Sequence, residues 1–343
     1  MVGKRTTLSD IAKKVGISKS AVSLAMNDSP MVSEQTRKLV VETALSMGYV
    51  KNELVSSMMS NIKRSGGKKF SETIALVNGN RDEFALTNHP TLPRYCEGIR
   101  EEASRLGYSI NEFWLHRPNL TGESFSRTLR SRGIRGGIIL GHSFGNVFPP
   151  SFKCVWKNFY FVSAGIKTHD PNLEMVSADH YAISYHAMLN ALQKGYKRPV
   201  LIIDEHIDNL VDGRFVAGFL RAQMGIPSEN IIPPLTESIS EDNLKNLDDY
   251  LKKYNPDAIL FLLDATRKVL QKSTVFKRRK IAMIQLERRN TNIDIPNWTG
   301  MEQNNDIVGK VAMRRLADML SRTSSVVGEN ANILTLIPPR WVE

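Results

Sequence analysis

Two short helical patterns joined by a glycine constrain the start of this chain more than any other feature of its sequence. Apolar residues recur at helical spacing between Leu8 and Val15. Thr7 and Asp10 stand three residues apart ahead of that run and predict a capping box. Gly16 predicts the end of the helix, because glycine readily takes the left-handed conformation found there.

A second helix is predicted after Ser18, a favourable capping residue, with Val22 and Ala25 facing inward. A third helix is predicted after Ser33, with Leu39 among its inward residues. Two short helices joined by a tight turn and supported by a third form a helix-turn-helix. The start of the chain is therefore expected to fold as a small, all-α headpiece.

The positive charge of the chain is concentrated in the same region. The whole chain of 343 residues has a net charge of +11. Its first 70 residues contain 12 lysines and arginines against 5 aspartates and glutamates, so the rest of the chain is close to balance. A basic segment that also folds indicates a polyanion-binding module attached to an ordinary globular core.

The second helix carries the candidate base-reading residues, since its N-terminal part enters the major groove in this motif. The candidates for the major groove are Lys19, Ser20, Ala21, Ser23 and Leu24. A lysine donates to guanine, a serine bonds several base edges, and a leucine contacts the thymine methyl group. For Ser23 and Leu24, ordinary surface positions remain the alternative.

The stretch from Thr7 to Asn52 resembles the headpiece of the lactose-repressor/galactose-repressor (LacI/GalR-type) family of bacterial transcriptional regulators. The shared residues include Asp10-Ile11-Ala12, Gly16-Ile17-Ser18, Ala21-Val22-Ser23 and Gly48-Tyr49. The resemblance implies a repressor that binds a pseudo-palindromic operator in double-stranded DNA as a homodimer. It also implies contacts to the DNA backbone from Thr7, Leu8, Asn27, Ser33 and Thr36.

Residues 50–71 are expected to form a hinge helix and a linker. By resemblance, Asn52, Val55 and Met58 face the minor groove, with Met58 at the position of the family's wedging leucine. Lys51 replaces a usual proline and Ser56 a usual arginine. Alternatively, Met58 only packs two hinge helices together. The glycines and basic residues that follow predict a flexible linker.

Residues 72–343 alternate predicted strands and helices, which indicates βαβ units and parallel sheets. One sheet would exceed the usual size, so two α/β lobes are expected. The core also resembles the family's sensor domain, which is similar to periplasmic sugar-binding proteins. The expected fold class is therefore α/β, with a headpiece at 1–49, an N-lobe at about 72–177 and 301–328, and a C-lobe at about 178–300 and 329–343.

A small-molecule effector is expected between the lobes, beyond the carboxyl ends of the strands. The candidate contacts are Leu92, Asp179, Arg214, Phe215, Asp264, Glu287 and Gln303. Phe215 stands where the family commonly has an effector-binding arginine, and Glu287 lies near the position of a common aspartate. These departures leave two alternatives open: a ligand unlike an ordinary pentose or hexose, or a degenerate site with ligand-independent DNA binding.

Other classes of function find less support in the sequence. We find no glycine-rich phosphate loop, nucleophile elbow or zinc-protease motif, so no catalytic residue, metal or cofactor is expected. A secreted binding protein is disfavoured because no signal peptide or membrane span is recognisable, and the two cysteines suit a cytoplasmic protein. An architectural DNA-binding protein without an effector remains the alternative to an effector-controlled regulator.

Overall fold

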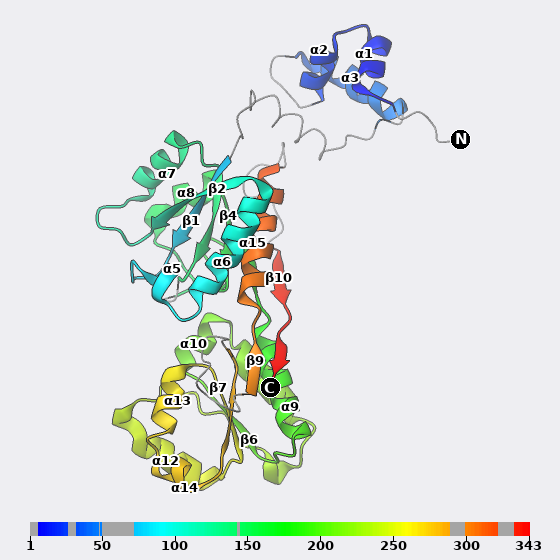
Figure 1. Ribbon diagram of the computed structural model, residues 1–343. Coiled ribbons are helices and arrows are strands. Elements are labelled where there is room, and N and C mark those ends of the chain that lie inside the picture. Colours follow the sequence, from blue (N-terminus) through cyan, green and yellow to red (C-terminus); the bar gives the residue numbers. More distant parts are fainter. Residues whose placement is uncertain are drawn as a thin grey trace. The chain divides into compact units, whose positions relative to one another are not determined.

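The computed structural model describes residues 6–26, 32–47, 49, 72–142, 145–288, 299–321 and 333–343. The chain separates into two compact units, one built around the three N-terminal helices and the other around two β-sheets. Figure 1 shows the helices and strands of both units. The predicted hinge and linker, residues 50–71, lie outside the described residues.

The first unit contains the helix-turn-helix predicted from the sequence. Its helices are α1 (Leu8–Val15), α2 (Lys19–Ala25) and α3 (Glu34–Ser46). The predicted capping box is confirmed, because Thr7 Oγ1 accepts from the Asp10 N–H while the Asp10 carboxylate accepts from the Thr7 N–H. Gly16 ends α1 with a φ of 77°, and Ser18 caps α2 by accepting from the Ala21 N–H.

The three helices share a small apolar core around Ile11, Val22 and Val40, all of which are buried. The prediction that Leu39 faces inward is wrong, because its side chain is 52 % exposed. Val40 and Ala44, which were also predicted to face inward, are buried. Leu39 precedes Val40 by about 100° around a helix of 3.6 residues per turn.

The N-lobe of the second unit is built on a six-stranded parallel sheet with the order β10-β5-β4-β3-β1-β2. Its strands are β1 (Glu72–Asn78), β2 (Tyr108–Trp114), β3 (Gly136–Leu140), β4 (Tyr160–Ala164), β5 (Glu174–Ala178) and β10 (Leu334–Ile337). The accompanying helices are α5 (Ala85–Asn88), α6 (Leu92–Leu106), α7 (Gly122–Ser131), α8 (Lys153–Asn158) and α15 (Asn305–Ser321).

The C-lobe is built on a five-stranded sheet with the order β11-β9-β8-β7-β6, in which only β11 is antiparallel to its neighbour. Its strands are β6 (Pro199–Ile202), β7 (Ala258–Phe261), β8 (Ala282–Gln285), β9 (Thr299–Glu302) and β11 (Arg340–Val342). Its helices are α9 (His180–Gln193), α10 (Glu205–Leu210), α11 (Arg214–Gln223), α12 (Leu244–Tyr254), α13 (Asp264–Leu270) and α14 (Thr274–Arg278).

Both faces of each sheet are buried by helices, which explains the continuous apolar runs in the strands. In β1, Ile74 and Leu76 point to one face and Ala75 and Val77 to the other, following the two-residue period of a strand. Separate helices cover the two faces, so each lobe is a three-layer α/β structure. The predicted fold class is confirmed.

The chain passes between the sheets after β5, between β9 and α15, and between β10 and β11. Residues 329–343 were expected to belong to the C-lobe alone, and this expectation is wrong for β10. That strand pairs in parallel with β5 of the N-lobe, and only β11 pairs within the C-lobe. The two strands are only four and three residues long, too short to reveal from sequence that the segment supplies one strand to each sheet.

Candidate DNA-binding and effector sites

The N-terminal part of α2 presents polar side chains to solvent. Lys19 and Ser20 are exposed, while Ala21 and Ser23 are half-buried. Leu24 is 37 % exposed although it is a large apolar residue. Val22 and Ala25, on the opposite face of α2, are buried. The helix is therefore packed through one face and leaves the other open for contact. The side chains expected to read bases are thus accessible on this face, and their contact with bases stays a prediction.

Four of the expected DNA-backbone contacts are capping residues or lie beside a cap. Thr7 is exposed and caps α1, while Leu8 is half-buried behind it. The Ser33 hydroxyl lies 2.8 Å from the Thr36 hydroxyl and accepts from the Thr36 N–H at the start of α3. Helix starts carry unpaired N–H groups and a positive dipole end, which suit phosphate.

The remaining expected DNA contacts are not placed. Asn27 lies outside the described residues, as do the hinge positions Asn52, Val55 and Met58. These assignments stay predictions that rest on the family resemblance.

In the second unit, the carboxyl ends of the two sheets carry the residues that join the lobes. Glu287, which follows β8, accepts a hydrogen bond from the Thr91 hydroxyl at 3.1 Å and from the Asn305 amide at 3.1 Å. Asn146, in the loop after β3, donates to the Leu210 carbonyl at 3.2 Å. Parallel sheets place ligand sites at these ends, so the interlobe residues are the candidate effector site.

Glu287 is the most enclosed of the candidate effector residues with a charge, with 5 % of its surface exposed. Its carboxylate also lies near the buried Tyr95 hydroxyl, whose pKa is raised mainly by burial and further by the charge of Glu287. Gln303 belongs to the same region, because its amide donates to the carbonyl of Leu286 at 3.1 Å. The Gln303 amide thus contacts the residue that precedes Glu287 in the chain.

A second group of candidate residues surrounds the start of α9. Asp179 caps this helix by accepting from the Ala182 N–H, and it pairs with Arg214, whose Nη2 is 3.2 Å from Asp179 Oδ1. The Nε of Arg214 is buried and has no partner among the described residues. Arg214, one residue before Phe215, is therefore the cation beside Asp179 at the start of α9.

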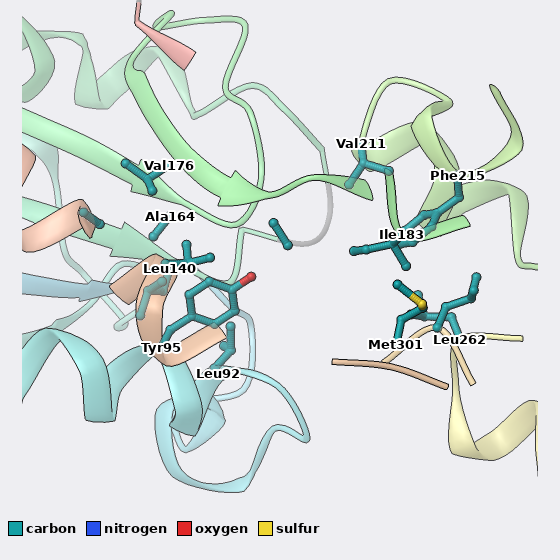
Figure 2. Packing of buried hydrophobic residues seen from close by; sticks show 14 of the residues in the cluster. Leu92, Tyr95, Leu140, Ala164, Val176, Ile183, Val211, Phe215, Leu262 and Met301 are labelled. Atoms are coloured by element: carbon teal, nitrogen blue, oxygen red, sulfur yellow. The ribbon is translucent and has the colours of Figure 1, made fainter. Parts of the chain in front are cut away.

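Phe215 is buried, with its ring centroid 4.9 Å from that of His180. Burial, and to a smaller extent the charge of the nearby Arg214, lowers the pKa of His180 to about 4. Figure 2 shows Phe215 with Val211 and Ile183 on the C-lobe side of the apolar cluster, and Leu92 with Tyr95 on the other side. Phe215 and Leu92 act here as packing residues.

Asp264 differs from the other candidates because cations of its own helix neutralise it. Its carboxylate lies 2.7 Å from Arg267 Nε and 3.6 Å from Lys268 Nζ. The hydrogen bond from Arg267 is the main reason why the pKa of Asp264 is lowered. Asp264 is the first residue of α13 rather than its cap, because Leu263 occupies that position.

Sequence reasoning missed several interlobe residues, notably Thr91, Asn305 and His169. His169 Nε2 lies 3.1 Å from Asp212 Oδ1 across the lobes. Each of these residues stands in a loop or at a helix start, where polar residues are common, so no sequence pattern marks it. Only the pairing of segments far apart in the chain reveals them.

Two kinds of feature are absent from the part of the chain that the structure describes. We find no group of three or more histidine, cysteine, aspartate or glutamate side chains arranged to hold a metal ion there. None of the described helices has the length and apolar character needed to cross a membrane.

Comparison with known proteins finds a family model that matches the headpiece. Residues 7–52 match the family model described as bacterial regulatory proteins, lacI family. The matched range covers α1, α2 and α3.

Two curated relatives match a longer part of the chain. The NTD biosynthesis operon regulator NtdR of Bacillus subtilis is 22 % identical over 200 residues, which cover 56 % of this chain and 53 % of the relative. The HTH-type transcriptional regulator MalR of Streptococcus pneumoniae is 25 % identical over 197 residues, which cover 57 % and 56 %. The chain thus spans about half the length of these relatives.

Solved structures show the same fold over almost the whole chain. A transcriptional regulator CelR–cellobiose complex has a TM-score of 0.57 at 18 % identity and covers 99 % of both chains. A lac repressor dimer bound to operator and the anti-inducer ONPF has a TM-score of 0.54 at 19 % identity, covering 99 % of this chain and 98 % of the other.

Proposed function

We propose that this chain, whose residues 7–52 match the lacI family model and whose fold is that of a solved lac repressor, is a sequence-specific transcriptional regulator acting as a repressor. The observation that carries the proposal is the open face of α2, where Lys19, Ser20 and Leu24 are exposed above a buried anchor. Lysine, serine and leucine are residue types that contact base edges in the major groove.

We propose that the protein acts as a homodimer in the cytoplasm, where its DNA is found. Two headpieces then read a pseudo-palindromic operator, because the symmetry of the site mirrors that of the dimer. Met58 in the hinge is proposed to insert into the minor groove between the half-sites, as apolar wedges do. The proposal assigns no catalytic step to the chain.

The core is proposed to bind a small molecule between its lobes. Glu287 and Gln303 on one side, and Asp179 with Arg214 on the other, offer hydrogen-bonding groups of both charges to a polar ligand. Ligand binding would change the contacts between the lobes and thereby the affinity for DNA. The coupling is reciprocal, so an effector that weakens DNA binding is itself bound more weakly on DNA.

The experiment that tests this function is selection of bound fragments from random duplex DNA at a fixed, physiological salt concentration, followed by sequencing. Salt is fixed because binding to phosphates alone falls steeply as salt rises. We expect a two-fold symmetric motif. If wild-type protein enriches no motif while Lys19→Ala binds the same pool equally well, the proposal of sequence-specific regulation is wrong.

The enriched motif then serves as the probe for effector control. A panel of sugars and sugar derivatives is screened for a change in operator affinity, with the Arg214→Ala variant as control. A ligand that shifts the wild-type affinity and not that of the variant supports the interlobe site. If no ligand of any class shifts it, the ligand-independent alternative replaces effector control.

A further inference from the structure

A hollow opens at the end of the six-stranded sheet that lies opposite the interlobe contacts. It has a volume of about 400 Å³ and is lined by Arg130, Gly133, Ile134, Arg135, Asn158, Phe159 and Tyr160. These residues stand at the end of α7, at the end of α8, and at the starts of β3 and β4. Because the strands are parallel, their amino ends share this one edge.

Positive charge gathers around this hollow. Arg130 and Arg135 line it, and the exposed side chains of Arg132 and Lys157 stand next to lining residues in the sequence. Arg135 pairs with Glu72, with 2.6 Å between Nε and Oε1. Arg130, Arg132 and Lys157 form no ion pair with any carboxylate that the structure describes.

Favourable charge at helix ends explains part of this pattern, because cations stabilise the C-terminus of a helix. It does not explain why Arg130 and Arg135 face a shared hollow of this size. The guanidinium of Arg130 lies 5.9 Å from the centre of the Phe159 ring, which holds it at the rim without neutralising it. Arginines arranged around a hollow are suited to the oxygens of a phosphate group.

The topology indicates where such a phosphate comes from. The chain leaves the headpiece and enters the core at Glu72, the first residue of β1, which lies on the same edge as the hollow. DNA held by the headpiece is therefore tethered to this edge of the core. Tethering raises the local concentration of a partner without any new contact.

We propose that this basic edge, defined by Arg130, Arg132, Arg135 and Lys157, binds the phosphate backbone of DNA flanking the operator. The inference rests on the proposed DNA binding and adds a second contact surface, on the core rather than on the headpiece. Contacts to phosphates carry no base preference, so this surface strengthens binding without changing the sequence that is read.

The test compares two duplexes, the selected motif alone and the same motif extended by one helical turn on each side. Affinity is measured over a range of salt concentrations for wild type, Arg130→Ala and the double variant Arg130→Ala/Lys157→Ala. The control is Lys277→Ala/Arg278→Ala, which removes two exposed cations from α14 in the C-lobe. Melting temperatures in chloride identify any variant that is misfolded.

On the extended duplex, we expect the negative slope of log affinity against log salt to become shallower by about one for each lost contact. The motif-only duplex and the C-lobe control should show wild-type slopes. Wild-type slopes for all variants on the extended duplex would overturn the proposal. The same comparison on random-sequence duplexes keeps the two hypotheses apart, since phosphate contacts persist there even if sequence-specific reading fails.

A small free anion is the other source of the same chemistry. Inorganic phosphate is therefore titrated into wild type and Arg130→Ala at constant ionic strength while the melting temperature is followed. If phosphate stabilises only the wild type and the DNA slopes stay unchanged, the hollow holds a free anion and the assignment to DNA is wrong.

Discussion

Single residues on α2 separate base reading from simple attraction to DNA. Lys19 is exposed at the start of the helix, where it can donate to a guanine. Lys19→Ala should relax the preference for one base in each half-site by about 1–3 kcal/mol. The measurement is selection and sequencing with the variant, with Lys14→Ala on α1 as the matched control. A change in salt dependence alone would make Lys19 a phosphate contact.

A buried histidine makes the stability of the core depend on pH. The pKa of His180 is about 4 because burial disfavours its charged form, whereas 6.5 is the ordinary value. Between these values the unfolded chain holds the proton and the folded chain does not. Acidification through this range therefore lowers the free energy of unfolding, by up to about 1.4 kcal/mol for each pH unit.

His180→Phe keeps an aromatic ring against Phe215 and removes the titration. We expect its loss of unfolding free energy between pH 7 and pH 5 to be about 2 kcal/mol smaller than that of wild type. Urea unfolding followed by tryptophan fluorescence reports on the core, since all four tryptophans follow residue 72. His206→Asn, at an exposed position, should behave as wild type. Equal losses for His180→Phe and wild type would contradict the assignment.

At the scale of elements, helices α6 and α15 approach each other through glycines. A Cβ on Gly98 would lie 1.9 Å from the Asp306 carbonyl oxygen, and one on Gly309 would lie 2.2 Å from that of Tyr95. Gly98→Ala must push the helices apart, so we expect it to destabilise the core by about 1–3 kcal/mol or more. Gly225→Ala, which meets open space, is the control in urea unfolding. Similar midpoints for both variants would show that the helix contact tolerates a methyl group.

Elements with strong local patterns could be predicted from the sequence, and the others could not. The apolar runs of β1, β3 and β7 and the long periodic helices α6, α9 and α15 give the alternation of strands and helices that the sequence predicts for the core. The sequence does not predict β9, β10 and β11, because these strands are short and, unlike β7, have no unbroken run of apolar residues. Glu287 and Gln303 were expected as candidates, but Thr91 and Asn305 depend on contacts between distant segments.

At the scale of the whole molecule, the contacts of Glu287 link two lobes that are otherwise joined by the chain segments that pass between the sheets. Hydrogen bonds to a charged group contribute about 1.5–3 kcal/mol each, and Glu287 accepts two from the N-lobe. Glu287→Ala should therefore favour more open arrangements of the lobes. We expect a larger radius of gyration in solution scattering than for wild type or for the exposed control Glu237→Ala. An unchanged radius would mean that other contacts hold the lobes together.

The interleaving of the two sheets also affects how this protein is made. Neither lobe is a continuous piece of chain. Strand β10, which ends at Ile337, completes the edge of one sheet, and β11, which begins at Arg340, completes the edge of the other. A nascent chain emerging from the ribosome thus carries two unfinished sheets with open edges until about residue 342 has been synthesised. Open strand edges are sites of aggregation, so a chaperone that shields them during translation should matter more for this core than for the headpiece, whose three helices are complete by Ser46.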